Sequence, residues 1–122
     1  MSFVPSSVTD TCGSMNQATA DAQNFGVVKV DDQGVIQIYN KWESDMAGVP
    51  ADQAVGKNFF TQIAPCTNNR LVYGKFQDGI GGGSLDAEFN YTFTYKMQPT
   101  NVVLRLFRDG ASGTNWVFVN KA

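Results

Sequence analysis

Apolar and polar residues alternate most regularly late in the chain, between positions 85 and 96. This two-residue period is typical of a strand with one buried face. The apolar positions are Leu85, Ala87, Phe89, Tyr91, Phe93 and Tyr95. Two further strands are predicted over 100–108 and 115–120, with the glycine-containing turn residues 109–113 between them.

Two shorter β-rich segments lie near the start of the chain, at 26–31 and 35–40. The residues between them are turn formers, so the two segments predict a hairpin. Strand pairs at both ends of the chain, with helices between them, imply an α+β fold. We expect a five-stranded antiparallel sheet flanked by short helices.

The region between these strand pairs has the spacing of several short helices. Asn40 is a favourable N-cap residue, and Glu43 stands three positions later, as in a capping box. A second short helix is predicted over 51–55. Residues 57–69 form a short helix or loop, and a further helix over 71–80 is expected to end at the glycines that follow it.

Residues 1–25 are small and polar and have little periodicity. We interpret them as a loosely held N-terminal cap on a core formed by residues 26–122. A chain of 122 residues corresponds to one domain. At this size a hydrophobic core suffices without a metal or a disulfide bond.

Charge and composition exclude several classes of partner. Nine Lys and Arg residues against eleven Asp and Glu residues give a net charge of −2, with no basic cluster. We therefore expect neither a nucleic-acid partner nor an acidic membrane partner. No apolar stretch approaches the ~18 residues of a membrane span, and no secretory signal is recognisable. A cytoplasmic monomer is the simplest expectation.

Histidine is absent from the chain. This absence excludes His-based triads, Cys–His nucleophiles and most zinc sites. We therefore expect neither an enzyme nor a metal site.

Two residues could carry chemistry, and each also has a purely structural interpretation. Cys66, which follows Pro65, is either a small buried apolar residue or an accessible site of acylation or oxidation. Glu43 is either a solvated capping residue or a buried, protonated carboxyl group that donates a hydrogen bond. The aromatic positions 89–95 are likewise either a core face or the wall of a pocket for a flat ligand.

Several short motifs occur in order and at close spacing along residues 25–122. They are Gly56-Lys-Asn-Phe-Phe60, Ala64-Pro-Cys-Thr67, Tyr73-Gly-Lys-Phe76, Tyr91-Thr-Phe93, Tyr95-Lys-Met97 with Pro99-Thr100, and Trp116-Val-Phe-Val119. Together they resemble the photoactive yellow protein family, blue-light receptors with the PAS fold. The resemblance implies a PAS fold for this chain, and the N-terminal cap shares it only loosely.

The resemblance also implies a set of site residues. Cys66 matches the cysteine that holds 4-hydroxycinnamic (p-coumaric) acid as a thioester. Tyr39 and Glu43 match the two residues that donate hydrogen bonds to the phenolate of this chromophore. The remaining expected pocket residues are Ala64, Pro65, Phe93, Tyr95 and Met97.

Two positions depart from the family pattern. Ala47 and Val49 stand where well-studied members carry a threonine and an arginine. The hydroxyl that supports the tyrosine and the guanidinium at the pocket mouth are therefore missing. For this reason the resemblance does not predict the absorption maximum or the rate of dark recovery, whereas it still implies attachment at Cys66.

The resemblance and the physics of buried charge together suggest a mechanism. After photoisomerisation, Glu43 gives up its proton and becomes a buried, unpaired ion, which is costly. We expect this cost to loosen the N-terminal cap and to signal to a downstream protein that the sequence does not name. The alternative is a PAS module that binds a ligand or a protein without a covalent chromophore. A thiol enzyme is a weaker third hypothesis, because no histidine is available to activate Cys66.

Overall fold

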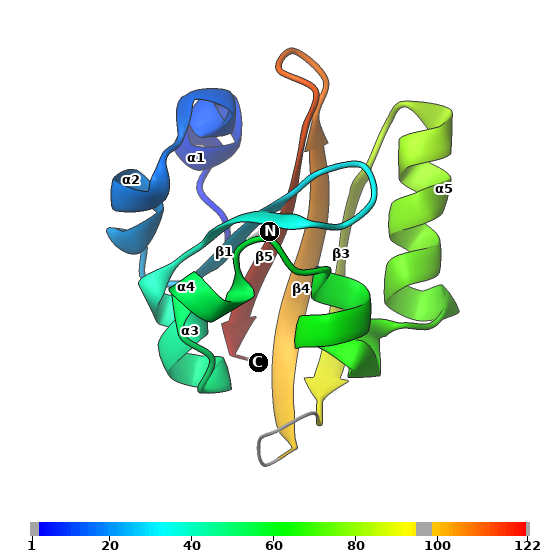
Figure 1. Ribbon diagram of the computed structural model, residues 1–122. Helices are drawn as coiled ribbons and strands as arrows, with labels where there is room; N and C mark the ends of the chain where they lie inside the picture. Colours follow the sequence, from blue (N-terminus) through cyan, green and yellow to red (C-terminus); the bar gives the residue numbers. More distant parts are fainter. Residues whose placement is uncertain (1–2, 95–98, 122) are drawn as a thin grey trace.

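The computed structural model describes residues 3–94 and 99–121 of the chain. Its centre is a five-stranded antiparallel sheet with the spatial order β2-β1-β5-β4-β3 (Figure 1). The strands are β1 (Gly26–Val30), β2 (Ile36–Tyr39), β3 (Asp86–Phe93), β4 (Thr100–Asp109) and β5 (Thr114–Lys121). The predicted hairpin, the three later strands and the α+β class are therefore confirmed.

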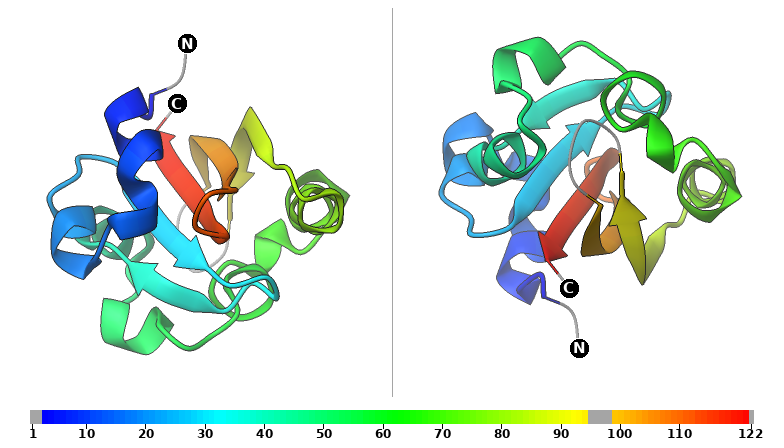
Figure 2. Two further views of the ribbon diagram at one scale, coloured as in Figure 1. Left: turned by 90° about the horizontal axis from the view of Figure 1, so that it is seen from above. Right: turned by 90° about the horizontal axis from the view of Figure 1, so that it is seen from below.

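Helices and short helical turns lie on both faces of the sheet (Figure 2). The α-helices are α1 (Ser6–Thr11), α2 (Gln17–Asp21), α3 (Lys41–Ala47), α4 (Ala51–Ala54) and α5 (Lys75–Gly82). The 3-10 turns are η1 (Cys12–Ser14) and η3 (Pro65–Thr67), and the π-helical turns are η2 (Phe59–Ile63) and η4 (Arg70–Gly74).

The predicted helix over 71–80 differs from the structure in its boundaries. Its first part is the π-helical turn η4, and α5 continues through the first two glycines to Gly82. The chain then leaves the helix at Gly83, whose φ of 73° lies in the left-handed region. Glycine adopts this conformation without the steric cost that a Cβ would add.

β1 lies inside the sheet, between β2 and β5, and is buried on both faces. Val28 and Val30 belong to the main core, which the helices between β2 and β3 cover. Val27 points to the other face, where it joins a second cluster that includes Trp116 and Phe118. The sheet therefore separates two hydrophobic cores.

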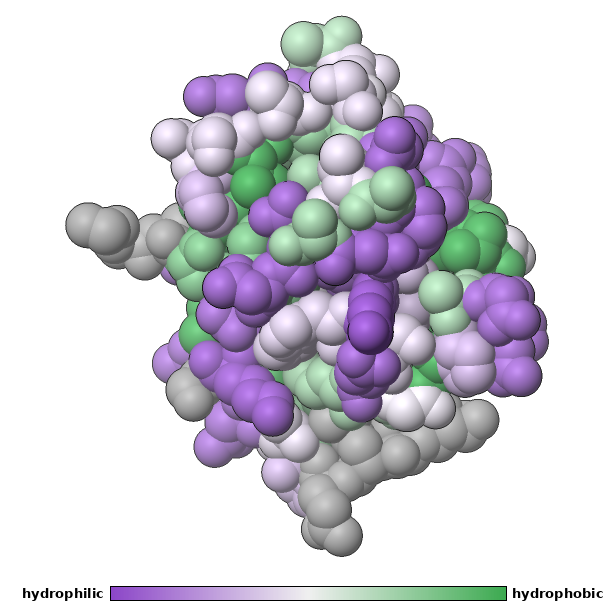
Figure 3. Space-filling view, turned by 90° about the vertical axis from the view of Figure 1, so that its left-hand side faces the viewer, coloured by the Kyte–Doolittle hydropathy of each residue, from purple (hydrophilic) through white to green (hydrophobic). Residues whose placement is uncertain are grey.

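The N-terminal cap covers this second cluster and packs more closely than its polar composition predicts. Val4, Val8, Cys12 and Ala20 are all buried there. These few apolar side chains meet the sheet, while the polar residues between them face solvent. Figure 3 views this side of the molecule, where hydrophilic and weakly polar residues predominate and hydrophobic areas are small.

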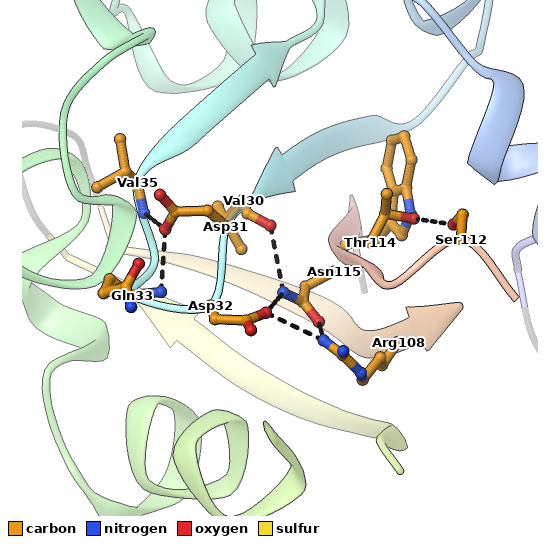
Figure 4. Close-up of polar contacts among 10 residues, drawn as sticks. Val30, Asp31, Asp32, Gln33, Val35, Arg108, Ser112, Thr114 and Asn115 are labelled. Atoms are coloured by element: carbon orange, nitrogen blue, oxygen red, sulfur yellow. Dashed lines mark hydrogen bonds and ion pairs between the residues drawn. The ribbon is translucent and has the colours of Figure 1, made fainter. Parts of the chain in front are cut away.

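A polar network joins the β1–β2 turn to β4 and β5 (Figure 4). The side chain of Asn115 is fully buried; its Nδ2 donates to Asp32 Oδ1 at 2.8 Å. Arg108 Nη1 donates to the same Asp32 oxygen at 3.0 Å and to Asn115 Oδ1 at 2.7 Å. These hydrogen bonds and the guanidinium charge hold the pKa of Asp32 below its usual range.

No helix in the described parts of the chain, 3–94 and 99–121, is long and apolar enough to cross a membrane.

The variant Asp32→Asn tests this network. Because the pKa of Asp32 is lowered in the folded state, its carboxylate stabilises the protein above the unfolded-state pKa of about 4. That contribution is lost as the pH falls through the folded-state pKa. The free energy of unfolding should therefore drop by at most about 1 kcal/mol at pH 7, since the pair is partly exposed.

Urea unfolding at pH 7 and pH 3 measures the effect, and the difference from wild type should shrink at pH 3. Asp45→Asn removes an exposed carboxylate outside the network and serves as the matched control. A difference that is equally large at both pH values would contradict the assignment.

Candidate functional site

Tyr39 and Glu43 lie at the junction between β2 and α3. Tyr39 is the last residue of β2, and Glu43 lies in the first turn of α3. The side chain of Tyr39 is fully buried and that of Glu43 is 2% exposed. Both residues line one narrow cavity between the sheet and the helices.

The inner ends of both side chains lack a protein partner. Among the described residues, Tyr39 Oη and Glu43 Oε1 are buried and have no hydrogen-bond partner. Burial raises the pKa of Glu43 to about 8, so the carboxyl group is protonated at neutral pH. Burial, with a smaller effect of the Glu43 charge, also raises the pKa of Tyr39. The site therefore presents two O–H donors.

Asn40 connects the start of α3 to the sheet and to the N-terminal cap. Its Oδ1 accepts from the backbone N–H of Glu43 at 3.1 Å and from that of Val27 at 3.0 Å. Its Nδ2 donates to the carbonyl oxygens of Ala20 and Phe25, at 2.9 and 2.8 Å. Since Asn40 is fully buried, all these bonds are shielded from water.

The predicted capping box forms only in part. Asn40 caps the helix as expected, but the Glu43 side chain does not return a bond to the Asn40 N–H. That N–H donates instead to Val27 O at 3.1 Å. Of the two interpretations left open by the sequence, the structure therefore selects the buried carboxyl group.

Gly26, the first residue of β1, leaves room for this carboxyl group. A Cβ at this position would collide with Glu43 Oε1 and would lie 2.9 Å from the Cβ of Val119. An L side chain here would therefore displace the Glu43 carboxyl. The sequence contains no local signal for this requirement, because the two residues are brought together only by the packing of α3 on β1.

The N-terminal cap also holds the backbone on either side of Asn40. Gln17 Nε2 donates to Tyr39 O at 2.9 Å, and the Tyr39 N–H donates back to Gln17 Oε1 at 3.4 Å. Asp21 Oδ1 accepts from the Lys41 N–H at 2.7 Å. The segment 39–41 is therefore bonded to α2 at three successive residues.

Cys66 reaches the same cavity from the turn η3. Its side chain is half-buried, and the turn is closed by Thr67, whose Oγ1 donates to Ala64 O at 2.6 Å. The cavity measures about 20 Å³, which is enough for one water molecule. Its lining residues are Tyr39, Glu43, Ala47, Phe59, Ile63, Ala64, Cys66 and Phe93.

The structure brings together most of the expected pocket residues. Ala64 and Phe93 line the cavity, and Pro65 begins the turn that carries the cysteine. Tyr95 and Met97 lie outside the described residues. Phe59 and Ile63 also line the cavity but are not among the pocket residues that the sequence predicted, although Phe59 belongs to the first of the motifs that carry the family resemblance.

The two departures from the family pattern occupy different surroundings. Ala47 lines the cavity, so a hydroxyl at this position would lie beside the site. Val49 is half-buried and packs against the main core.

Cys12, the other cysteine, is in the second hydrophobic cluster and is completely buried. Burial, with a smaller effect from the charge of Asp109, raises the pKa of its thiol to about 11. Because the thiolate is the reactive form, Cys12 is protected from acylation. In the described parts of the chain no His, Cys, Asp and Glu side chains cluster as a metal site would require.

Comparisons with known proteins agree on one family. The chain is 35% identical to the photoactive yellow protein of Rhodothalassium salexigens over 119 residues, which are 98% of this chain and 95% of that protein. No family model matches the chain.

Solved structures give the same result. The crystal structure of the photoactive yellow protein domain from the sensor histidine kinase Ppr of Rhodospirillum centenum superimposes with a TM-score of 0.86. The two sequences are 40% identical, and the superposition covers 93% of this chain and 99% of the Ppr domain. The PAS domain of the RpfR quorum-sensing receptor from Cronobacter turicensis is 17% identical, covers 81% of this chain and 94% of that one, and has a TM-score of 0.66. The predicted PAS fold is therefore confirmed.

The raised pKa of Glu43 predicts a pH dependence for the chromophore-free protein. The unfolded carboxyl group ionises near pH 4.3, whereas the folded group keeps its proton up to about pH 8. The contribution of protonated Glu43 to the free energy of unfolding is therefore complete below the unfolded-state pKa. It is lost as the pH rises through the folded-state pKa. Between these limits the free energy of unfolding of the wild type should fall, relative to that of Glu43→Gln, by up to about 1.4 kcal/mol per pH unit.

Urea unfolding from pH 4 to pH 9 measures this difference. Asp45→Asn, which neutralises an exposed carboxylate on the same helix, is the matched control and should run parallel to the wild type. Parallel curves for the wild type and Glu43→Gln would refute the buried, protonated carboxyl group.

Proposed function

The chain belongs to the photoactive yellow protein family of photoreceptors, and we propose that its Cys66 carries p-coumaric acid as a thioester and makes it a blue-light receptor. One observation above all supports this proposal. The half-buried Cys66 lines the same cavity as Tyr39 and Glu43, the two residues whose Oη and Oε1 atoms are buried without a hydrogen-bond partner. A buried donor without an acceptor is costly, and a bound phenolate is the kind of acceptor that removes this cost.

The chemistry of the lining residues fits such a group. Phe59, Ile63 and Phe93 offer apolar surfaces to an aromatic ring, and the two O–H donors suit a phenolate oxygen. The cavity of about 20 Å³ is smaller than p-coumaric acid. Binding therefore requires that the lining side chains move apart.

When bound, p-coumaric acid supplies a phenolate that absorbs blue light and a double bond that isomerises. Tyr39 and Glu43 stabilise the anion in the dark, because O–H donors form short, charge-assisted bonds about twice as strong as neutral ones. The raised pKa of Glu43 suits it to this role, since only the protonated carboxyl group can donate.

After light absorption Glu43 would give its carboxyl proton to the phenolate oxygen to which it had donated a hydrogen bond. Loss of the proton leaves a carboxylate that is 2% exposed and has no cationic partner among the described residues, a state that costs several kcal/mol. This cost is comparable to the stability of a whole domain, about 5–15 kcal/mol. It therefore suffices to open a local region.

The hydrogen bonds at residues 39–41 provide a route from this charge to the N-terminal cap. Asn40 caps the helix that carries Glu43 and also bonds to Ala20 and Phe25. Gln17 bonds to the backbone of Tyr39. A shift of α3 therefore strains the contacts that hold α2, and we propose that loosening of the cap is the signalling step.

The output is proposed to be a contact with a separate or linked signalling protein. The related domain from Rhodospirillum centenum belongs to a sensor histidine kinase. Loosening of the cap would expose the cluster around Trp116 and Phe118, which is an apolar surface of the kind that protein partners bind.

Acylation of the purified protein tests the attachment site. With p-coumaric anhydride, the wild type should gain the mass of one p-coumaroyl group and a visible absorption band. The Cys66 thiolate attacks the anhydride carbonyl, and p-coumarate leaves. Intact mass and peptide mapping should place the adduct on Cys66, and Cys66→Ala should remain colourless.

Cys12→Ala is the matched control and should become coloured like the wild type. An adduct on Cys12, or an uncoloured wild type, would overturn the proposal.

The proton-transfer step is tested with Glu43→Gln in the loaded protein. Glutamine still donates a hydrogen bond but cannot release a proton, so the variant should be coloured with a shifted band. Its N-terminal cap should then lose less hydrogen-exchange protection under light than the cap of the wild type. Hydrogen exchange of residues 3–25 in darkness and under illumination measures this response, and an equal light-induced loss of protection in the variant and the wild type would exclude the proton-transfer step.

A further inference from the structure

Tyr91 and Asn69 both bond to the backbone carbonyl of Cys66. Tyr91 Oη donates to Cys66 O at 2.5 Å, and Asn69 Nδ2 donates to the same oxygen at 3.1 Å. Asn69 Nδ2 also donates to Tyr91 Oη at 2.7 Å. The three groups therefore form a closed ring of hydrogen bonds at the backbone of Cys66.

The amide of Asn69 is fully used in this arrangement. Its Oδ1 accepts from the N–H groups of Leu71 and Val72, at 2.9 and 3.1 Å, and so caps η4. Its two amide hydrogens serve Cys66 and Tyr91. Because the oxygen must face the helix, the NH₂ group must face the Cys66 carbonyl.

Tyr91 links this ring to the sheet. It belongs to β3 and pairs with Val102 of β4, and its ring makes an edge contact with Phe93 at a centroid distance of 6.2 Å. Phe93 lines the cavity, whereas Tyr91 does not. Tyr91 therefore contacts the backbone of Cys66 and does not form part of the cavity wall.

We propose that Tyr91 and Asn69 are positioning residues that hold the Cys66 carbonyl and thereby aim its thiol into the cavity beside Tyr39 and Glu43. The carbonyl carbon and Cβ share one Cα, so a fixed carbonyl restricts the direction of the Cα–Cβ bond, and the thiol is left with the staggered positions about that bond. The inference rests on the proposed function only in taking Cys66 as the acylated thiol.

The carbonyl bond can be tested in the protein without a chromophore. The chain has two cysteines, so labelling with cysteine that carries ¹³C at the carbonyl carbon gives two resonances. In Tyr91→Phe the Cys66 resonance should move upfield, because its carbonyl loses a donor. The Cys12 carbonyl accepts from the Met15 N–H at 3.0 Å and serves as an internal reference that should not move.

The positioning role is tested by comparing two reagents. Acylation by p-coumaric anhydride requires a thiol aimed into the cavity, whereas a small methanethiosulfonate reagent reaches the thiol from any direction. In Tyr91→Phe the acylation rate should fall about fivefold, the equivalent of one net hydrogen bond, while the rate with the small reagent does not fall. General destabilisation would instead raise both rates.

Two further variants complete the test. Asn69→Ser keeps an oxygen that caps η4 but lacks the amide donors, so it should shift the Cys66 resonance and slow acylation as Tyr91→Phe does. Tyr73→Phe is the matched control, since the Tyr73 hydroxyl donates to Gln33 O at 3.4 Å, away from Cys66. It should behave as the wild type.

An unmoved Cys66 resonance in Tyr91→Phe would overturn the inference, as would unchanged rates with both reagents. A wild type that cannot be acylated would overturn the proposed function, while the carbonyl resonance would still decide whether the ring of hydrogen bonds exists.

Discussion

The cost of burying a polar group without a partner governs this structure. Tyr39 Oη and Glu43 Oε1 are enclosed among apolar side chains and find no hydrogen-bond partner in the described parts of the protein. A fold tolerates such atoms only where the surrounding packing enforces them. Here the enforcement comes from a short α-helix whose first turn is fixed by Asn40, and from Gly26, which leaves room for the Glu43 carboxyl group.

The same junction joins the two hydrophobic cores. Residues 39–41 leave the sheet edge, begin α3 and accept or donate hydrogen bonds to the N-terminal cap on the other face. The proposed coupling between the site and the cap needs no long path, because one buried asparagine bonds to both. Such coupling would be reciprocal, so that cap docking would in turn stabilise the arrangement of Tyr39 and Glu43.

The two cysteines show how tertiary environment separates residues of one type. Cys12 is sealed in the second cluster, and the pKa of its thiol is raised to about 11. Cys66 is half-buried, lines the cavity and has its carbonyl held by Tyr91 and Asn69. Accessibility and orientation therefore distinguish them, and both properties depend on contacts between residues far apart in the sequence.

The sequence by itself determined the elements whose signals are local. The alternation over 85–93, the turn residues after β1 and the N-cap at Asn40 all correspond to observed structure, because strand period, turn chemistry and capping involve neighbouring residues. The family resemblance indicated Cys66, Tyr39 and Glu43 as candidates. Only the tertiary structure decided that the Glu43 carboxyl faces inward and that a polar segment seals the far side of the sheet. Both outcomes depend on which residues meet across the sheet, which no local pattern records.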